Sequence, residues 1–236
     1  MSTQPGPAAS GVVVVGSHTD IGKTWVSCRL LESWRRQGID VAAKKPIVSG
    51  FDECCVAQSD PGLLLAALGR DGASVADVNE ISPWRFPDPV APDEAARRAG
   101  REVTLREVLA FCRAPSPRLQ LIETAGGVMS PFTSDGTTLD FVLGLGLPTV
   151  LVVGDYLGGI SHGLSAWTIL RDRNIPVLGI VINRATDANA ERAYRQHTVG
   201  TAVWSVPVDG SLEGIATVAR DALRWSANHA GHMSAS

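Results

Sequence analysis

Short apolar runs alternate with longer amphipathic segments along this chain. The short runs are rich in β-branched residues and nearly continuous in apolar positions, which is typical of parallel strands that are covered on both faces. The pattern predicts strands over Val12–Val15, Val41–Lys44, Leu119–Glu123, Thr149–Val153, Val177–Ile182 and Ala202–Ser205.

Helices are predicted between these strands, and several of them have a recognisable start signal. Thr104 followed by Glu107 has the spacing of a capping box. Asp60, Ser161 and Ser211 are candidate N-cap residues. The predicted helices cover Lys23–Gln37, Gly62–Leu68, Pro92–Gly100, Leu105–Arg113, Leu139–Gly144, His162–Arg173, Asn189–His197 and Leu212–Trp225.

The order of these elements predicts the fold class. Strands that alternate with helices form units in which parallel strands share one sheet and helices cover both of its faces. We therefore expect an α/β fold with a three-layer, doubly wound, mostly parallel sheet and right-handed crossovers. Ligands of such folds bind at the carboxyl ends of the strands, so the residues that follow each strand form the candidate site.

The composition places nearly the whole chain in one domain. The 236 residues are 44% hydrophobic and 19% charged, which suits a single α/β domain with a sizeable core over residues 11–226. Residues 1–10 and 227–236 are small and polar, and we expect them to be flexible tails.

Charge and cysteine content limit the partners and the location. The net charge of -3 predicts no partnership with nucleic acid. Met1–Ser10 lacks the apolar core of a signal peptide, and the valine runs are too short to cross a bilayer, so no membrane partner is expected. The cysteines have neither zinc-ligand nor disulfide spacing and predict free thiols in the cytoplasm. They are Cys28, Cys54, Cys55 and Cys112.

The strongest local signal follows the first predicted strand. Val12–Val15 leads into the loop Gly16-Ser17-His18-Thr19-Asp20-Ile21-Gly22-Lys23-Thr24, after which a helical pattern begins. Such a loop turns backbone N–H groups and a helix N-terminus toward phosphate, with Lys23 on the β- and γ-phosphates and Thr24 on Mg²⁺. The loop is a variant, because Ser17 stands where the usual pattern has glycine. It predicts nucleotide binding in a P-loop NTPase-like fold, with His18 as a spacer.

Charged residues stand at the ends of two further strands and before one helix. Lys45 follows the second strand, where a lysine is either solvated or able to reach over the phosphate loop. Asp60 precedes a helix, as an N-cap or as a metal ligand. Glu123 ends an apolar strand, a position from which acidic residues of P-loop proteins help to hold Mg²⁺. Neither carboxylate has an obvious ion-pair partner in the sequence, so both are predicted metal ligands.

Glycines and one amide mark the remaining strand ends. Gly126-Gly127 permits close approach of the backbone to a ligand. Gly158–Ser161 is either a second anion site at a helix start or a plain loop in which Ser161 is the cap. Asn183 offers the donor and acceptor that adenine recognition requires, and Pro207-Val208-Asp209 could complete a base pocket.

Taken in order, these motifs resemble the dethiobiotin synthetase family, and the resemblance covers nearly the whole chain. It rests on Gly16–Thr24, Lys45–Gly50, Ser59-Asp60, Ile81–Phe86, Ala91–Asp93, Glu123–Gly127, Leu157–His162 and Asn183. The chain departs from the family pattern at Asp20, Thr124, Asp155-Tyr156 and Ser161, none of which is a metal ligand or a catalytic lysine.

The resemblance implies an ATP-dependent ligase of biotin biosynthesis. The family converts 7,8-diaminopelargonate, CO₂ and ATP into dethiobiotin, ADP and phosphate. One amine of the substrate forms a carbamate, which attacks the γ-phosphate, and the second amine then closes the ureido ring on the mixed anhydride. The resemblance also implies Mg²⁺ as a cofactor and a homodimer, in which helix-start amides of the second subunit bind the substrate carboxylate.

The resemblance further implies a role for each matching residue. Lys45, Lys23 and Thr19 would be catalytic, and Thr24, Asp60 and Glu123 would hold the metal. The substrate would contact Ser49, Gly158, Gly159, Ile160 and Ser161. ATP contacts are implied at Asp20, Ile21, Gly22, Lys23, Thr24, Trp25, Asp60, Glu123, Thr124, Ala125, Gly126, Asn183, Pro207, Val208 and Asp209.

Two other functions use a P-loop of this kind. A related ligase, such as a cobyrinate amidating enzyme, usually carries a glutaminase domain, for which a chain of 236 residues leaves no room. A partitioning or carrier ATPase usually has an extra lysine early in the loop, where this chain has Gly16-Ser17-His18. Phosphate release measured with and without 7,8-diaminopelargonate distinguishes these functions.

Overall fold

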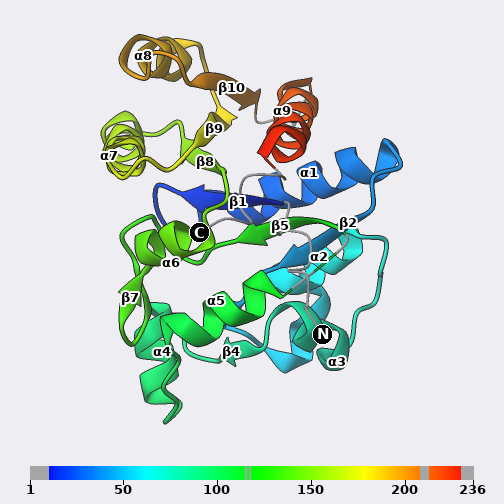
Figure 1. Cartoon of the computed structure of the whole chain (residues 1–236). Helices are drawn as coiled ribbons and strands as arrows, with labels where there is room; N and C mark the ends of the chain where they lie inside the picture. The colour runs from blue at the N-terminus through cyan, green and yellow to red at the C-terminus, as the bar shows by residue number, and fades with distance from the viewer. Residues whose placement is uncertain (1–10, 115, 117, 208–212, 230–236) are drawn as a thin grey trace, which may run out of the picture.

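A six-stranded parallel sheet lies at the centre of the protein (Figure 1). The computed structural model describes residues 11–114, 116, 118–207 and 213–229. In spatial order the strands are β10 (Ala202–Pro207), β9 (Val177–Ala185), β8 (Thr149–Gly154), β1 (Gly11–Gly16), β5 (Leu119–Glu123) and β2 (Val41–Lys44). All neighbouring pairs are parallel, which confirms the predicted sheet.

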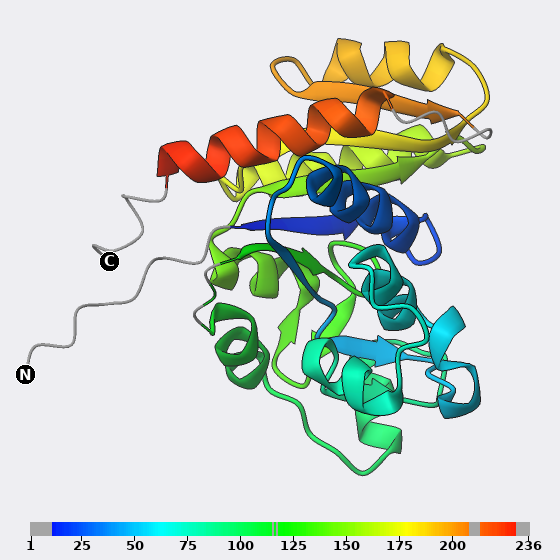
Figure 2. The same ribbon diagram turned by 90° about the vertical axis from the view of Figure 1, so that its right-hand side faces the viewer.

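Helices cover both faces of this sheet (Figures 1 and 2). One face carries α1 (Lys23–Arg36), α2 (Asp60–Ala67), α3 (Val75–Ile81) and α9 (Glu213–His229), and the other carries α5 (Leu105–Arg113), α6 (Thr138–Leu145), α7 (Gly159–Asp172) and α8 (Asn189–His197). Successive side chains of a strand point to opposite faces. In β1, Val12 and Val14 therefore enter one core, and Val13 and Val15 enter the other. The predicted three-layer α/β fold is confirmed.

Several short elements lie between the predicted ones. β3 (Ile47–Ser49) pairs in parallel with β4 (Trp84–Phe86), and β6 (Pro131–Thr133) pairs with β7 (Gly136–Thr137) in an antiparallel ribbon. The 3₁₀ helix η1 (Glu53–Gln58) follows β3 in the chain, and α4 (Pro92–Arg98) follows β4. The sequence analysis did not predict β3, β4, β6, β7, η1 or α3, because such short runs carry little periodicity.

The helix starts confirm some predictions and correct others. The capping box of Thr104 with Glu107 is present at α5. Asp60 is the first residue of α2 and not its N-cap, because the Ser59 hydroxyl accepts the hydrogen bond from the Gly62 N–H. Ser161 is not a cap either, since α7 begins at Gly159 behind Gly158, whose backbone is left-handed. Ser211 lies outside the described residues.

The end of α9 also differs from the prediction. The helix extends to His229, beyond the predicted helix end at Trp225 and into the segment 227–236 that was expected to be a flexible tail. Its side chains Val218, Ala219 and Ala222 enter the same core as α1. The long C-terminal helix is therefore part of the layer that covers this face of the sheet.

The strand ends that carry the candidate residues meet at one edge of the sheet. β1 lies between β8 and β5, and β2 lies beyond β5 at the outer edge. The loops that follow β1, β5 and β2 are consequently neighbours, as expected for the ligand-binding edge of an α/β sheet. Within the part of the chain that the structure describes, no helix is long and apolar enough to cross a membrane.

Candidate active site

The loop between β1 and α1 is held in shape by a buried asparagine. Asp20 and Gly22 have left-handed backbone conformations, with φ of 59° and 96°. A Cβ atom on Gly22 would lie 2.0 Å from Nδ2 of Asn183, so only glycine fits at this position. Nδ2 of Asn183 donates a hydrogen bond to the carbonyl oxygen of Ile21 at 2.9 Å. Asn183 therefore supports the phosphate loop from the end of β9.

Lys23, the first residue of α1, joins the phosphate loop to the loop after β5. Its Nζ donates to the carbonyl oxygens of Gly126 at 2.7 Å and His18 at 3.2 Å. Burial lowers the pKa of Lys23 to about 8, and the nearby Lys45 charge acts in the same direction. No side chain caps the N-terminus of α1, which leaves a helix end suited to binding an anion.

Lys45 lies between the two carboxylates that were predicted to bind metal. Its Nζ donates to Oε1 of Glu123 at 2.6 Å and also to Oδ2 of Asp60. The Thr24 hydroxyl donates to the same Oε1 of Glu123 at 2.7 Å. The sequence-based view that the carboxylates have no ion-pair partner is therefore wrong, because the fold gives both of them the same lysine.

The electrostatics of this cluster follow from its burial and its charges. Burial by itself would lower the pKa of Lys45, but the adjacent carboxylates of Glu123 and Asp60 outweigh it and raise the pKa. For Asp60, burial acts to raise the pKa, and the Lys45 ammonium outweighs it, so the pKa lies below its usual range. Lys45 therefore carries a positive charge at neutral pH.

A cavity of about 310 Å³ opens above this cluster at the strand ends. Most of the residues predicted for phosphate, metal and substrate line it together. They are Thr19, Asp20, Gly22, Lys23, Thr24, Lys45, Ser49, Asp60, Ala125 and Gly126, joined by Val48. Glu123 lies beneath, fully buried, in contact with Lys45 and Thr24. The structure thus brings residues from the loops after β1, β2 and β5 and from the start of α2 around one space.

Other candidate residues lie outside this cavity. Thr124 is fully buried, and its hydroxyl donates to the Val14 carbonyl oxygen at 3.2 Å, which ties β5 to β1. Ile21 is buried beside the glycines Gly16 and Gly154. The Trp25 ring lies under the guanidinium of Arg29, 5.6 Å from the ring centroid. Pro207 ends β10, and Val208 and Asp209 lie outside the described residues.

Gly158–Ser161 lies on a different part of the same sheet edge. It precedes and starts α7, which follows β8, and β8 is separated from β2 by β1 and β5. Beside it Leu157 is fully exposed, and Ile160 and Leu164 are partly exposed while packing against the core on this side of the sheet. The helix start and Lys45 are therefore on opposite sides of the phosphate loop within one chain.

Histidine side chains that the sequence analysis did not assign to a site gather beside the phosphate loop. Oη of Tyr156 lies 3.2 Å from Nδ1 of His18 and 2.7 Å from Nδ1 of His162. Nδ1 of His18 is also 3.0 Å from the Ser17 hydroxyl. His18 thus connects the phosphate loop to the start of α7, a role that its description as a spacer did not include.

The donor set around Glu123 fits a magnesium ion. Mg²⁺ prefers oxygen ligands and is usually held by one or two carboxylates together with phosphate oxygens and water. Thr24, Asp60 and Glu123 supply only oxygen atoms. Oε2 of Glu123 is buried without a hydrogen-bond partner, an orphaned acceptor of the kind that a cation would satisfy. Within the described part of the chain, no group of three His, Cys, Asp or Glu side chains converges on one position that could hold a metal.

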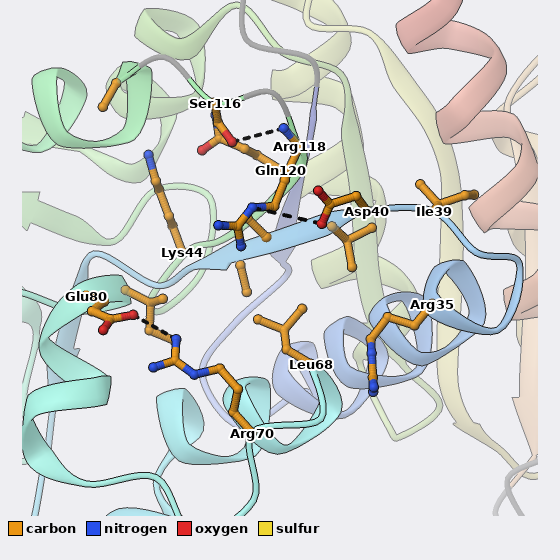
Figure 3. Close-up of a pocket in the computed structure, with 15 residues that line it drawn as sticks. Arg35, Ile39, Asp40, Lys44, Leu68, Arg70, Glu80, Ser116, Arg118 and Gln120 are labelled. Carbon is orange, nitrogen blue, oxygen red and sulfur yellow. Dashed lines mark hydrogen bonds and ion pairs between the residues drawn. The ribbon is translucent and has the colours of Figure 1, made fainter.

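A second cavity, of about 560 Å³, surrounds the edge strand β2 away from the phosphate loop (Figure 3). Its charged residues are largely paired with one another. Arg70 is bonded to Glu80 at 2.7 Å, and Arg118 lies 3.9 Å from Asp40. It contains none of the phosphate-loop residues. Of these two cavities, only the one above Lys45 is lined by the phosphate loop.

The fold and the site together define a P-loop nucleotide-binding protein. Residues 10–219 match a family model described as an AAA domain. Among solved structures, the chain is similar to the cell division ATPase MinD of Pyrococcus furiosus, with 16% identity, a TM-score of 0.53 and coverage of 92% of this chain and 99% of that one. It is also similar to a chain of the MinC:MinD cell division protein complex of Aquifex aeolicus, with 12% identity, a TM-score of 0.54 and coverage of 92% and 96%. These similarities concern the fold alone.

Sequence relatives are more specific. The chain is 42% identical to the ATP-dependent dethiobiotin synthetase BioD of Phenylobacterium zucineum, over 91% of this chain and 97% of the relative. It is 45% identical to the protein of the same name from Caulobacter vibrioides strain NA1000 / CB15N, over 74% of this chain and 80% of the relative. The chain belongs to the ATP-dependent dethiobiotin synthetase family, which confirms the resemblance of its motifs, and it is an ATP-dependent ligase.

Proposed function

We propose that this protein makes dethiobiotin from 7,8-diaminopelargonate, CO₂ and ATP, releasing ADP and phosphate. The observation that carries the proposal is the meeting of two buried lysines, two carboxylates and the Thr24 hydroxyl at one cavity behind a phosphate loop. Phosphoryl transfer depends mainly on positioning and on neutralising charge, which this set of groups provides. Membership of the dethiobiotin synthetase family supports the choice of substrate.

The reaction proceeds through three bond-forming steps, and the second of these is at the γ-phosphate. An amine of the substrate adds CO₂ and loses a proton to give a carbamate. A carbamate oxygen attacks the γ-phosphorus, and the bond to the β–γ bridging oxygen breaks to release ADP. The second amine attacks the carbonyl carbon of the anhydride, phosphate leaves, and the ring nitrogen loses its proton. Holding carbamate and phosphate in line removes much of the entropic barrier, an effect that reaches about 7–11 kcal/mol in well-oriented systems.

Residues around the cavity have separate roles in this reaction. Lys23 contacts the transferring phosphate from the phosphate-loop side, and Lys45 approaches it from the β2 side. Ser49 and Thr19, which line the same cavity, orient the diamine and the carbamate. The base of the nucleotide lies toward the ends of β9 and β10, near Asn183 and Pro207. The other predicted base contacts, Val208 and Asp209, lie outside the described residues.

Thr24, Asp60 and Glu123 would hold Mg²⁺, whose charge neutralises the β- and γ-phosphates when it is bound. We expect Glu123→Gln to weaken Mg²⁺-dependent ATP binding at least tenfold, because the variant loses a charged oxygen ligand. Calorimetry with and without Mg²⁺ measures this effect, with Glu107→Gln at the exposed capping box of α5 as the control. Equal affinity and equal Mg²⁺ dependence in Glu123→Gln and wild type would remove Glu123 from the metal site.

The working enzyme is a two-fold homodimer in this proposal, and Gly158–Ser161 of the second subunit binds the substrate carboxylate. The position of this segment, away from Lys45 in its own chain, supports the arrangement. The exposed Leu157 and the partly exposed Ile160 and Leu164 supply an apolar surface for a subunit contact. The partners are thus small molecules and a second copy, without nucleic acid or membrane. The unpaired thiols of Cys54 and Cys55 support a cytoplasmic location.

Product formation tests the proposal directly. The purified protein with 7,8-diaminopelargonate, bicarbonate, ATP and Mg²⁺ should yield dethiobiotin, identified by its mass, in equal amount to the phosphate released. Phosphate release at the same rate without the diamine, and no dethiobiotin with it, would indicate a carrier-type ATPase. A ligase for another substrate would release no phosphate with this diamine.

A further inference from the structure

Lys45 contacts two of the three predicted metal ligands. Its ammonium lies 2.6 Å from Oε1 of Glu123 and also contacts Asp60. Thr24, the remaining predicted ligand, donates to the same Oε1 of Glu123. The side chain of Lys45 is 5% exposed and that of Glu123 is fully buried, so water contributes little screening to this pair. One positive group therefore already occupies the space between these ligands.

Lys45 opposes the entry of a second cation. Oε1 of Glu123 accepts hydrogen bonds from both Thr24 and Lys45, which uses its two lone-pair directions and leaves Oε2 as the oxygen of this carboxylate that is open to a metal ion. A divalent ion beside the ammonium would meet strong repulsion in this poorly screened environment. Lys23 and Lys45 face the three carboxylates of Asp20, Asp60 and Glu123, so a divalent metal added without an anion leaves the cavity with excess positive charge.

We propose that Lys45 is an internal counter-ion of the metal site, and that metal and nucleotide must therefore enter together. The nucleotide phosphates supply the negative charge that Lys45 needs when it leaves Glu123 and Asp60. Lys45 lines the same cavity, so its ammonium can leave the two carboxylates and contact the transferring phosphate instead. The inference rests on the proposed function in one respect, that this cavity holds the nucleotide phosphates.

The adjacent lysine gives a matched control. Lys44 points to the other side of β2, where its Nζ donates to the carbonyl oxygens of Phe111 at 2.8 Å and Cys112 at 3.2 Å. Lys44→Met removes one positive charge one residue away without touching the metal ligands. Any effect of net charge alone would therefore be the same in Lys44→Met and Lys45→Met.

Binding of Mn²⁺ tests the proposal without any turnover. Mn²⁺ accepts the same oxygen ligands as Mg²⁺ and is counted by the electron paramagnetic resonance signal of the free ion. Without nucleotide, we expect wild type and Lys44→Met to bind Mn²⁺ weakly. Lys45→Met and Lys45→Gln should each bind one ion per chain at least tenfold more tightly than wild type. The double variant Lys45→Met with Glu123→Gln should lose this gain. Circular dichroism of each variant verifies that it is folded.

Three results would overturn the proposal: tight Mn²⁺ binding by nucleotide-free wild type, no gain in a folded Lys45 variant, or an equal gain in Lys44→Met. If both Lys45 variants unfold, the Mn²⁺ affinity of the wild type with and without ADP still tests the proposal. Addition of ADP must strengthen Mn²⁺ binding at least tenfold. Failure of the proposed function has a different signature, since the product assay would fail while the Mn²⁺ measurements keep the expected pattern.

Discussion

At the scale of single residues, the adjacent lysines at the end of β2 have opposite surroundings. Successive side chains of an extended strand point to opposite sides. Lys44 therefore reaches the end of α5, with its Nζ 5.0 Å from the centroid of the Phe111 ring. Lys45 reaches Glu123 and Asp60 instead. The register of the strand, and not the residue type, decides which lysine lies in the site.

We expect Lys45→Ala to lower kcat by about a hundredfold or more, in line with the loss of one preorganised charge at the reacting phosphate. Steady-state rates of dethiobiotin formation measure the effect. Lys44→Ala serves as the control and should keep kcat within about twofold of wild type. A near-normal kcat for Lys45→Ala would exclude Lys45 from the mechanism.

A second prediction concerns the asparagine that holds the phosphate loop. Asn183→Ala leaves the Ile21 carbonyl oxygen without the hydrogen bond from Nδ2, and the left-handed turn at Gly22 loses its support. We expect the Kd for ATP to rise about tenfold, equivalent to about 1.4 kcal/mol. Calorimetric titration measures the Kd. Asn189→Ala, on the exposed surface of α8, is the matched control, and equal values for the two variants would contradict the prediction.

At the scale of elements, the structure depends on how α1 packs against the sheet and against α9, its neighbour in the same layer. Trp34 of α1 is fully buried, and its Nε1 donates to the Ala219 carbonyl oxygen of α9 at 2.9 Å. Val26, Leu30 and Leu31 of α1 enter the same core. The helix that carries Lys23 and Thr24 at its start is thus anchored along its length.

We expect Trp34→Ala to lower the free energy of unfolding by about 3–5 kcal/mol, because it opens a large cavity between α1 and α9. Trp34→Phe keeps most of the packing and loses the hydrogen bond, so it should cost about 1–3 kcal/mol. Urea unfolding followed by circular dichroism measures both values. A Trp34→Ala protein as stable as Trp34→Phe would show that α9 does not depend on this contact.

At the scale of the whole molecule, one chain carries the two proposed functional regions on the same sheet edge. Lys45 lies at the β2 side of the phosphate loop, and Gly158–Ser161 lies at the β8 side. A two-fold axis can bring the first region of one subunit next to the second region of the other. The proposed dimer therefore uses both regions in each of its sites.

Mixing two inactive variants tests this arrangement. Lys45→Ala disables the first region, and Ser161→Trp blocks the exposed helix start of the second. Ser161 is preferred to Gly159, where a Cβ atom would lie 2.6 Å from the Gly154 carbonyl oxygen and would disturb the subunit itself. Random pairing gives heterodimers as half of all dimers, each with one intact site, so activity should recover to about a quarter of wild type. A mixture no more active than its components would contradict the shared site.

Local patterns in the sequence were enough to predict much of this protein. The continuous apolar strands, the phosphate loop and the order of the site motifs follow from residue types at short spacing, which act before any long-range contact forms. The capping box at Thr104 and Glu107 belongs to the same kind of local signal. For this reason the sheet, the fold class and the family were predictable without a structure.

Only the tertiary structure decided how the charged residues pair. Lys45 and Glu123 are 78 positions apart, and Asn183 and Ile21 are 162 apart, so their contacts depend on strand order and packing that no local pattern encodes. Because the Ser59 hydroxyl caps α2, the Asp60 carboxylate is free to accept the hydrogen bond from Lys45. Sequence alone indicated candidate residues for the site, and the fold determined that Lys45 and the predicted metal ligands lie together, because β2, β5 and α2 converge there.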